Sequence, residues 1–228
     1  MPQYVYKTET SKVSLSSSAV VVLSWVGATG TLQFNGASLS KNSANAGLGD
    51  CVFVPLSVGF HFSENNNLAI STYVFAPTGL FTPGNLSNLG MNEWTVMPNF
   101  AYTYLWKKHG LEFDNFVGFD IYGKDETTNY TSGTMFHWDG MVLKHLPERF
   151  AFGAIGSNLT QITKDRGPLA DLLHGFEGRA SGVGPLLLYV AKVEKPGVIL
   201  QLRWVNEFLV TNLMKGNMFE AGITLKMK

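Results

Sequence analysis

Residues 111–122 read Leu-Glu-Phe-Asp-Asn-Phe-Val-Gly-Phe-Asp-Ile-Tyr, and residues 135–146, beyond a polar loop, read Met-Phe-His-Trp-Asp-Gly-Met-Val-Leu-Lys-His-Leu. In both segments every second residue is mostly apolar, and the residues between them are acidic, polar, small or aromatic. This period of two predicts β-strands with one apolar and one more polar face. Alternating segments of about ten residues, separated by turn residues, are typical of transmembrane β-barrels.

The composition fits a surface that meets lipid. The 228 residues carry a net charge of zero, 15% charged residues, 13% aromatic residues and 24 glycines. Soluble domains have about a quarter charged residues. The longest apolar run, 185–191, is far below the roughly 18 residues of a spanning helix, which leaves a barrel as the membrane fold. Neutral charge argues against nucleic acid as a partner, and the single Cys51 excludes an internal disulfide.

We therefore expect one domain over residues 1–228, an all-β, antiparallel, up-and-down transmembrane barrel of about twelve strands. The expected strands are 2–8, 12–24, 27–36, 49–63, 66–76, 93–106, 110–123, 132–146, 148–162, 179–193, 197–211 and 216–227. Short turns at 64–67, 107–110, 146–149 and 194–197 alternate with longer loops near 37–48, 77–92, 123–131 and 163–178. This alternation matches the short periplasmic turns and long outer loops of bacterial barrels.

Two strands show the expected lipid-facing pattern in detail. In 93–106 the alternate residues from Trp94 to Trp106 are apolar or aromatic, and the two tryptophans are spaced to lie near both membrane interfaces. In 49–63 we expect one face to carry Val52, Val54, Leu56, Val58, Phe60 and Phe62.

Several short stretches resemble a known family. They are 73–79, which ends Pro-Thr-Gly; 88–95, Asn-Leu-Gly-Met-Asn-Glu-Trp-Thr; 47–50; 201–204; and 207–208. In this order they resemble the phenol-degradation "meta" family of outer-membrane channels, from about Gly47 to the C-terminus. The resemblance implies a barrel in the bacterial outer membrane, of a kind often encoded beside aromatic catabolism genes, that admits small, poorly soluble organic compounds.

The chain departs from this family at both ends. Its first residues are not a signal peptide, so we expect that a signal peptide, and perhaps a first segment, is missing. It ends Lys226-Met227-Lys228, whereas such barrels end in an aromatic or apolar residue. We expect a monomer surrounded by outer-membrane lipid or detergent.

Ionisable residues on the polar faces of the strands are the candidate channel lining. Arg203 and Glu207 lie four apart on one strand face, and a charge at membrane depth is tolerated only in a polar interior with a partner. We predict a lumenal network that shapes what passes; the alternative is a structural plug that fills a small barrel. The predicted lining residues are Arg203, Glu207, Gln201, Asp139, His137, Glu112, Asp114, Asp120 and Glu220.

We expect a passive channel for small solutes, hydrophobic or aromatic by the resemblance, with no catalytic residue, cofactor or metal. One alternative is a barrel enzyme that acts on lipids, which requires a serine, a histidine and a carboxamide on one outward face. The five histidines are scattered, and His137 points inward by its strand phase. Another alternative is a soluble lipocalin-like binder, but its many outward aromatic residues would form an aggregation-prone surface in water.

Overall fold

The computed structural model describes residues 3–34, 37–147, 149–172, 175, 177–191, 197–213 and 215–226. The expected turn at 194–197 lies outside these residues except for Gly197. The same is true of residues 2 and 227, at the outer ends of the first and last expected strands, and of His174. Within the described residues no helix is long and apolar enough to cross a membrane.

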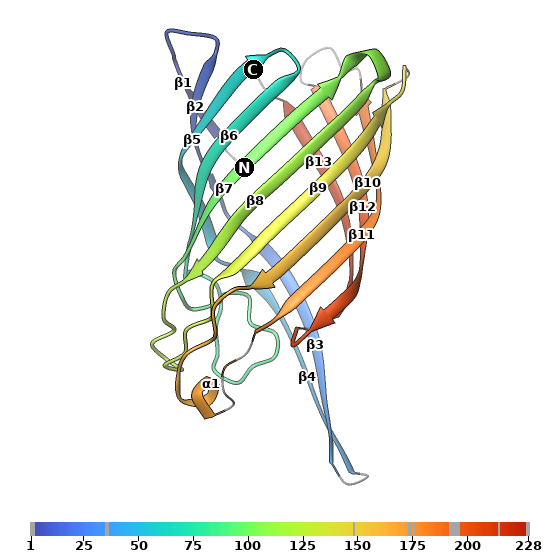
Figure 1. Ribbon diagram of the computed structural model, residues 1–228. Helices are drawn as coiled ribbons and strands as arrows, with labels where there is room; N and C mark the ends of the chain where they lie inside the picture. The colour runs from blue at the N-terminus through green and yellow to red at the C-terminus, as the bar shows by residue number, and fades with distance from the viewer. Residues whose placement is uncertain are drawn as a thin grey trace.

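The structure is built almost entirely from strands (Figure 1). Their bounds are β1 Gln3–Tyr6, β2 Val13–Val20, β3 Leu23–Phe34, β4 Ala37–Leu48, β5 Cys51–Ser63, β6 Asn66–Ala76, β7 Thr95–Trp106, β8 Leu111–Tyr122, β9 Met135–His145, β10 Phe150–Gln161, β11 Arg179–Ala191, β12 Gly197–Thr211 and β13 Asn217–Lys226. A short helix, α1, covers Pro168–Leu172.

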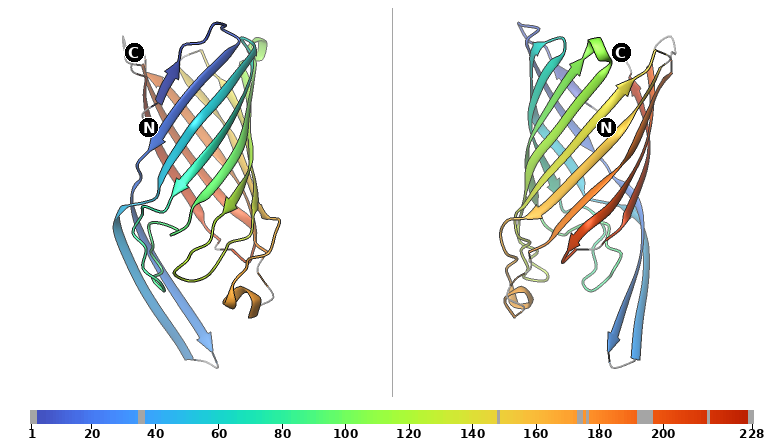
Figure 2. Two further views of the ribbon diagram at one scale, coloured as in Figure 1. Left: turned by 90° about the vertical axis from the view of Figure 1, so that its left-hand side faces the viewer. Right: turned by 45° about the vertical axis from the view of Figure 1, so that its right-hand side comes forward.

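Eleven strands form one antiparallel sheet in the order β1-β2-β5-β6-β7-β8-β9-β10-β11-β12-β13. Neighbours in the sheet are neighbours in sequence, apart from the β3–β4 hairpin between β2 and β5, and the sheet curls into a barrel (Figure 2). This confirms the predicted up-and-down antiparallel fold. In the described residues β1 and β13 are the sheet's two ends and do not pair with each other.

The two ends of the barrel differ. The short turns and the last residues of β13 lie at one end, and the long loops, α1 and the β3–β4 hairpin lie at the other (Figures 1 and 2). By the loop rule for bacterial barrels, the first end is periplasmic and the second is extracellular.

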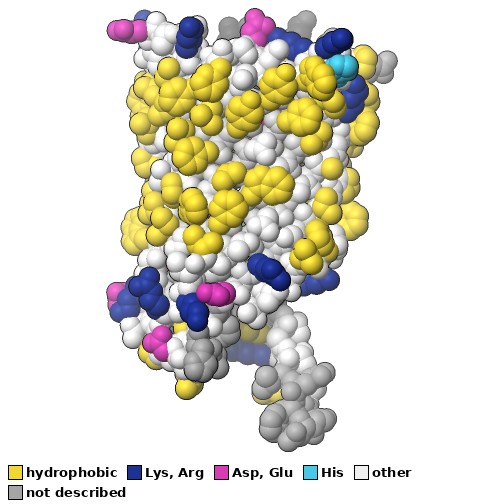
Figure 3. Space-filling view, in the orientation of Figure 1, with side chains coloured by type: hydrophobic (Ala, Val, Ile, Leu, Met, Phe, Trp, Pro, Cys, Tyr) yellow, Lys and Arg dark blue, Asp and Glu magenta, His cyan; other side chains and the backbone are white. Residues whose placement is uncertain are grey.

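The outer wall carries the apolar side chains that the alternation predicts. In β7 the outward Phe100 and Trp106 are 48% and 44% exposed, whereas the inward Asn99 is 1% exposed. On the face drawn in Figure 3, apolar side chains are spread over the wall between the two rims, and most charged side chains lie at the rims. An apolar band of this kind is typical of a barrel surface that contacts the hydrocarbon layer of a membrane.

The prediction of a loop at 37–48 is wrong, because these residues form β4. β4 pairs with β3 along its whole length, from Leu23↔Leu48 to Phe34↔Ala37. This two-stranded ribbon projects beyond the extracellular end (Figure 1), so β3 replaces the end of the expected strand 12–24 and most of 27–36. A ribbon outside the membrane needs no apolar face, and β4 is rich in Ser, Asn and Ala. Hydrophobic periodicity therefore could not reveal it.

The single apolar face expected for 49–63 is also wrong, because the strand changes phase at Pro55. Val52 and Val54 are buried on the inner side, whereas Leu56 and Phe62 are 48% and 63% exposed on the outer side. The register with β6 shifts between Phe53 and Ser57, which marks a β-bulge. Proline has no N–H for the ladder and favours such irregularities.

Candidate functional site

The nine predicted lining residues lie on the inward faces of β8, β9, β12 and β13, opposite the exposed apolar rows. The structure does not join them into one network. It divides them into separate groups at different places on the inner wall, and it adds partners that the sequence did not suggest.

The most buried group links three strands. His137 of β9 contacts Asp120 of β8 through Nδ1, at 2.8 Å, and Asn99 of β7 through Nε2, also at 2.8 Å. All three residues are buried. The amide of Asn99 donates to the carbonyl of Met97 at 2.7 Å, which turns its Oδ1 toward the histidine. Both ring nitrogens therefore face oxygen atoms, and the imidazole is held from both sides by neighbouring strands.

Gly118 makes this group possible. It lies between Asn99 and His137 in the ladder, and the histidine reaches across it from β9 to β7. A Cβ at position 118 would lie 2.2 Å from Asn99 Oδ1 and 2.8 Å from His137 Cε1. The absence of a side chain at Gly118 therefore leaves the space that the Asn99–His137 hydrogen bond occupies.

A second group lies nearer the periplasmic end. Asp114 accepts a hydrogen bond from the hydroxyl of Thr103 at 2.5 Å, and Glu112 contacts His145 Nε2 at 2.5 Å. Neither Thr103 nor His145 is among the predicted lining residues. Because the hydrogen-bond partners lie on neighbouring strands, these two residues could be predicted only if the strand register were known.

Arg203 pairs with Glu220, across the β12–β13 ladder. Its Nη2 lies 2.5 Å and its Nε 3.0 Å from Glu220 Oε2. Glu207, the other expected partner, instead accepts from the backbone N–H of Gly216 at 2.7 Å. Asp139 makes no ion pair with a described residue, but it lies within electrostatic reach of His137 and Arg203.

The inner wall also has an apolar sector, which lies outside the predicted set of polar lining residues. Leu143, Ala151 and Leu186 form a buried cluster, with Met141 and Leu188 packed against it. On the next strand Leu186 faces Arg203, and Leu188 faces Gln201. Apolar surface and hydrogen-bonding groups therefore lie side by side on β11 and β12.

A layer of loops lies at the extracellular end, and hydrogen bonds of residues outside the predicted lining set join these loops. The Asp50 carboxylate accepts from the backbone N–H groups of Gly79 and Met91, at 2.8 Å each. Gly79 and Gly90 touch so closely that a Cβ on Gly79 would lie 2.7 Å from Gly90 Cα. The family-like stretches 47–50, 73–79 and 88–95 thus form one structural unit.

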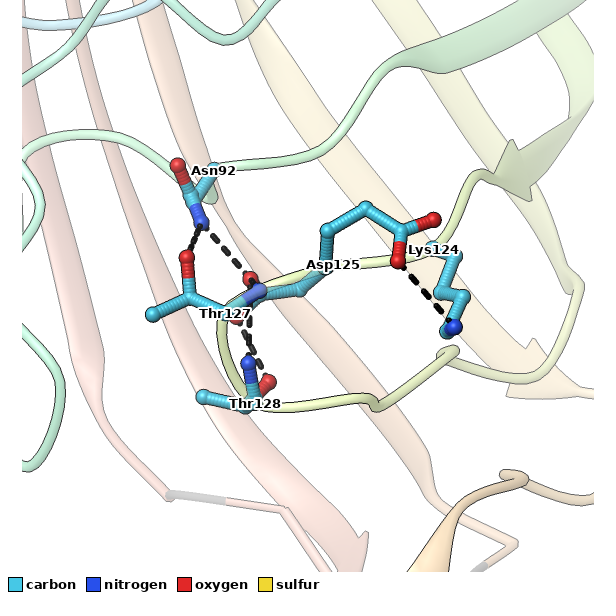
Figure 4. A network of polar contacts seen from close by, with 6 residues as sticks. Asn92, Lys124, Asp125, Thr127 and Thr128 are labelled. Atoms are coloured by element: carbon cyan, nitrogen blue, oxygen red, sulfur yellow. Dashed lines mark hydrogen bonds and ion pairs between the residues drawn. The ribbon is translucent and has the colours of Figure 1, made fainter.

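The same layer continues through Asn92. Its amide donates to Asp125 Oδ1 at 2.6 Å and to Thr127 Oγ1 at 2.9 Å, which ties the 77–94 loop to the 123–134 loop (Figure 4). Asp125 also accepts from Thr128, through its hydroxyl at 2.6 Å. Burial alone would raise the pKa of Asp125, but the hydrogen bonds from Thr128, Thr127 and Asn92 outweigh it and lower that pKa.

Asp165 connects the third loop, between β10 and β11, to the 123–134 loop. It accepts from Gly133 N at 2.7 Å and from Gln161 Nε2 at 2.6 Å, and it pairs with the Tyr130 hydroxyl. Burial, followed by the contact with Asp165, raises the pKa of the Tyr130 phenol. The three loops are thereby joined to one another above the barrel.

Glu93 is the exception in this layer. It lies just before β7, is 4% exposed, and has no hydrogen-bond partner among the described residues. Burial raises the pKa of its carboxyl to about 7, and the charges of Asp125, Asp165 and Asp50 act in the same direction. Glu93 is therefore the carboxyl of this region that gains or loses a proton near neutral pH.

Comparison with protein-family models identifies the family of this chain. The model described as "Putative MetA-pathway of phenol degradation" matches residues 1–221. The chain belongs to this family. The match confirms the resemblance and extends it to residues before Gly47. No curated protein matches the chain.

A solved structure has the same fold as this family member. An outer membrane channel from Pseudomonas putida F1 has a TM-score of 0.70 over 98% of this chain and 79% of that chain, at 14% sequence identity. The fold and the family confirm an outer-membrane β-barrel in a bacterium, of the architecture used by outer-membrane channels.

Proposed function

We propose that this barrel is a passive channel that takes up small hydrophobic or aromatic molecules across the outer membrane. The observation that carries the proposal is the inner-wall sector in which Leu186 and Leu188 face Arg203 and Gln201. An aromatic solute with a hydroxyl group needs an apolar surface for its ring and a polar partner for its hydroxyl. Family membership supports the same class of solute.

The mechanism is diffusion along the inner wall. A solute leaves water by contacting Met141 and Leu188, the partly exposed side chains that pack against the buried Leu143 cluster, and Arg203, Gln201 and Asp139 offer hydrogen bonds along the way, so that no single site binds too tightly. Entry from outside requires displacement of the joined loops that hold Asp50, Asn92 and Asp165. We propose that these loops regulate access, and that one chain suffices, because the sector lies within a single barrel.

The test is solute influx into vesicles that contain the refolded protein. We expect Leu188→Gln, which makes the sector polar, to slow influx of phenol about three- to tenfold, because burial of apolar ring surface is lost. Gln201→Leu extends the apolar surface and is expected to leave phenol influx equal or faster. The double variant exchanges the two facing side chains and is expected to restore influx toward the wild-type rate.

Influx of an uncharged sugar of similar size serves as the control, and it is expected to be slow and insensitive to these changes. Phenol influx equal to that of protein-free vesicles, in protein that shows the heat-modifiable gel shift of a folded barrel, would overturn the proposal. Equal phenol and sugar rates would show an unselective pore.

A further inference from the structure

Three polar side chains at the periplasmic end of the barrel form a hydrogen-bonded chain across three neighbouring strands. Ser14 lies at the start of β2, His61 near the end of β5 and Asn67 at the start of β6. His61 Nε2 lies 3.0 Å from Ser14 Oγ, and His61 Nδ1 lies 2.7 Å from Asn67 Oδ1. The three belong to the inner wall, because the next residue of β5, Phe62, points outward.

The Asn67 carbonyl oxygen, at one end of this hydrogen-bonded group, determines which atoms of the group donate. Asn67 is oriented with its carbonyl oxygen toward the ring, and in this orientation Nδ1 of His61 carries the hydrogen of that bond. In a neutral imidazole, Nε2 is then the acceptor, and the Ser14 hydroxyl donates to it. This arrangement is a nucleophile bonded to a base that a third group orients, which is the general requirement for an activated serine.

The absence of a side chain at Gly59 leaves room for the Ser14 hydroxyl. It pairs with Ser14 in the ladder, and a Cβ at position 59 would lie 2.5 Å from Ser14 Oγ. Even an alanine would therefore push the hydroxyl away from His61 while leaving all three side chains in the protein.

This group differs from the other inner-wall histidine that bonds through both nitrogens. His137 is buried between Asp120 and Asn99, and no hydroxyl of a described residue is bonded to it. His61 is exposed, and its base nitrogen bonds a hydroxyl. A molecule at the periplasmic mouth can therefore reach the Ser14–His61 pair.

We propose that Ser14, His61 and Asn67 form an ester-hydrolysing site at the periplasmic mouth of the barrel. Ser14 Oγ attacks the ester carbonyl carbon while His61 Nε2 takes the hydroxyl proton. The C–O bond to the leaving group breaks, and His61 returns that proton to the departing oxygen. Water then attacks the acyl-serine, again with His61 as the base, and releases a carboxylic acid and free Ser14. Ser14 and His61 are catalytic residues, and Asn67 is a positioning residue.

The position of Ser14 within a strand indicates the substrate class. Backbone N–H groups in a ladder are used by the neighbouring strands, whereas strong stabilisation of the oxyanion needs donors aimed at it. The site is therefore suited to esters that need little oxyanion stabilisation because their leaving group is already a stable anion. Aryl esters of small acids meet this requirement, because they release a phenol.

The test uses the full chain in detergent, with p-nitrophenyl acetate as substrate and a fluorophosphonate as covalent probe. Wild-type protein is expected to hydrolyse the ester and to carry the phosphonate on Ser14 by peptide mass spectrometry. Ser14→Ala and His61→Ala are each expected to lower the rate at least about 100-fold, and the double variant no further. Ser16→Ala, on the same strand face, is the matched control and is expected to keep the wild-type rate.

Two further variants separate chemistry from folding. Gly59→Ala should lose activity with the gel shift intact, because it displaces only the hydroxyl. Asn67→Ala is expected to lower kcat, and Asn67→Asp to restore it with the acidic limb of the pH profile moved upward, since a carboxylate stabilises the protonated imidazole. An unlabelled Ser14, or a Ser14→Ala rate equal to wild type, would overturn the proposal. Neither readout depends on transport.

Discussion

Two charged groups on the inner wall are built from the same chemistry in different surroundings. Asp120 and His137, with Asn99, are buried and hydrogen-bonded across three strands. The Arg203 and Glu220 side chains pair directly, yet they remain 28% and 41% exposed. A buried pair that loses one partner leaves an uncompensated charge, whereas an exposed pair is worth little. The first group therefore stabilises the wall, and the second remains partly exposed on its inner face.

The largest effect is expected from Gly118→Ala. The new methyl group would overlap Asn99 Oδ1, at 2.2 Å, and Pro98 O, at 2.5 Å. We expect a loss of about 2–4 kcal/mol in the free energy of unfolding, from overpacking and from the broken buried hydrogen bond. Urea unfolding in lipid vesicles, followed by tryptophan fluorescence, measures it.

Gly156→Ala is the matched control, because the nearest atom to its new Cβ would be Trp138 Cζ3 at 3.8 Å. It is expected to change stability by less than about 1 kcal/mol. Equal losses for the two glycines would show that the gap at Gly118 has no special role, and the contrast between the two charged groups would lose its structural basis.

A smaller effect is expected from charge removal without a change of shape. Asp120→Asn is expected to cost about 1.5–3 kcal/mol, because the buried imidazole loses its hydrogen bond to a carboxylate. Glu220→Gln is expected to cost about 0–1 kcal/mol, as for exposed pairs. The same urea titration measures both. If Glu220→Gln proves as costly as Asp120→Asn, the Arg203 pair is structural as well.

Local alternation was enough to predict the barrel, the strands from β5 onward and the inward rows, because a strand's two faces follow directly from its sequence. Pro55 changed the phase of β5, and β4 had no apolar row to detect. The partners on the inner wall depend on register: His137 meets Asn99 only because Gly118 lies between them. Pairs such as Arg203 with Glu220 join residues of different strands, so spacing along one strand pointed to Glu207 instead.

The loop layer adds a third case, the buried Glu93 carboxyl, which has no hydrogen-bond partner among the described residues. Its effect on stability depends on pH. The pKa of Glu93 is raised to about 7, so the folded state prefers its neutral form. Its contribution to stability is complete at acidic pH and is lost as the pH rises through about 7. We expect the joined loops to loosen by about 1–2 kcal/mol between pH 5 and 8.5. Asp125, whose pKa is lowered, stays ionised over this range and does not mask the effect.

Hydrogen exchange of the backbone N–H groups at 88–94 and 123–131, compared at pH 5, 7 and 8.5 after correction for the intrinsic pH dependence of exchange, measures this loosening. Glu93→Gln keeps the shape and cannot ionise, so its loops are expected to be equally protected at all three values. Wild-type loops with the same flat profile would show that the Glu93 carboxylate has found a partner or water at high pH. In that case burial without a partner would not distinguish Glu93 from the paired carboxylates Asp50, Asp125 and Asp165 around it.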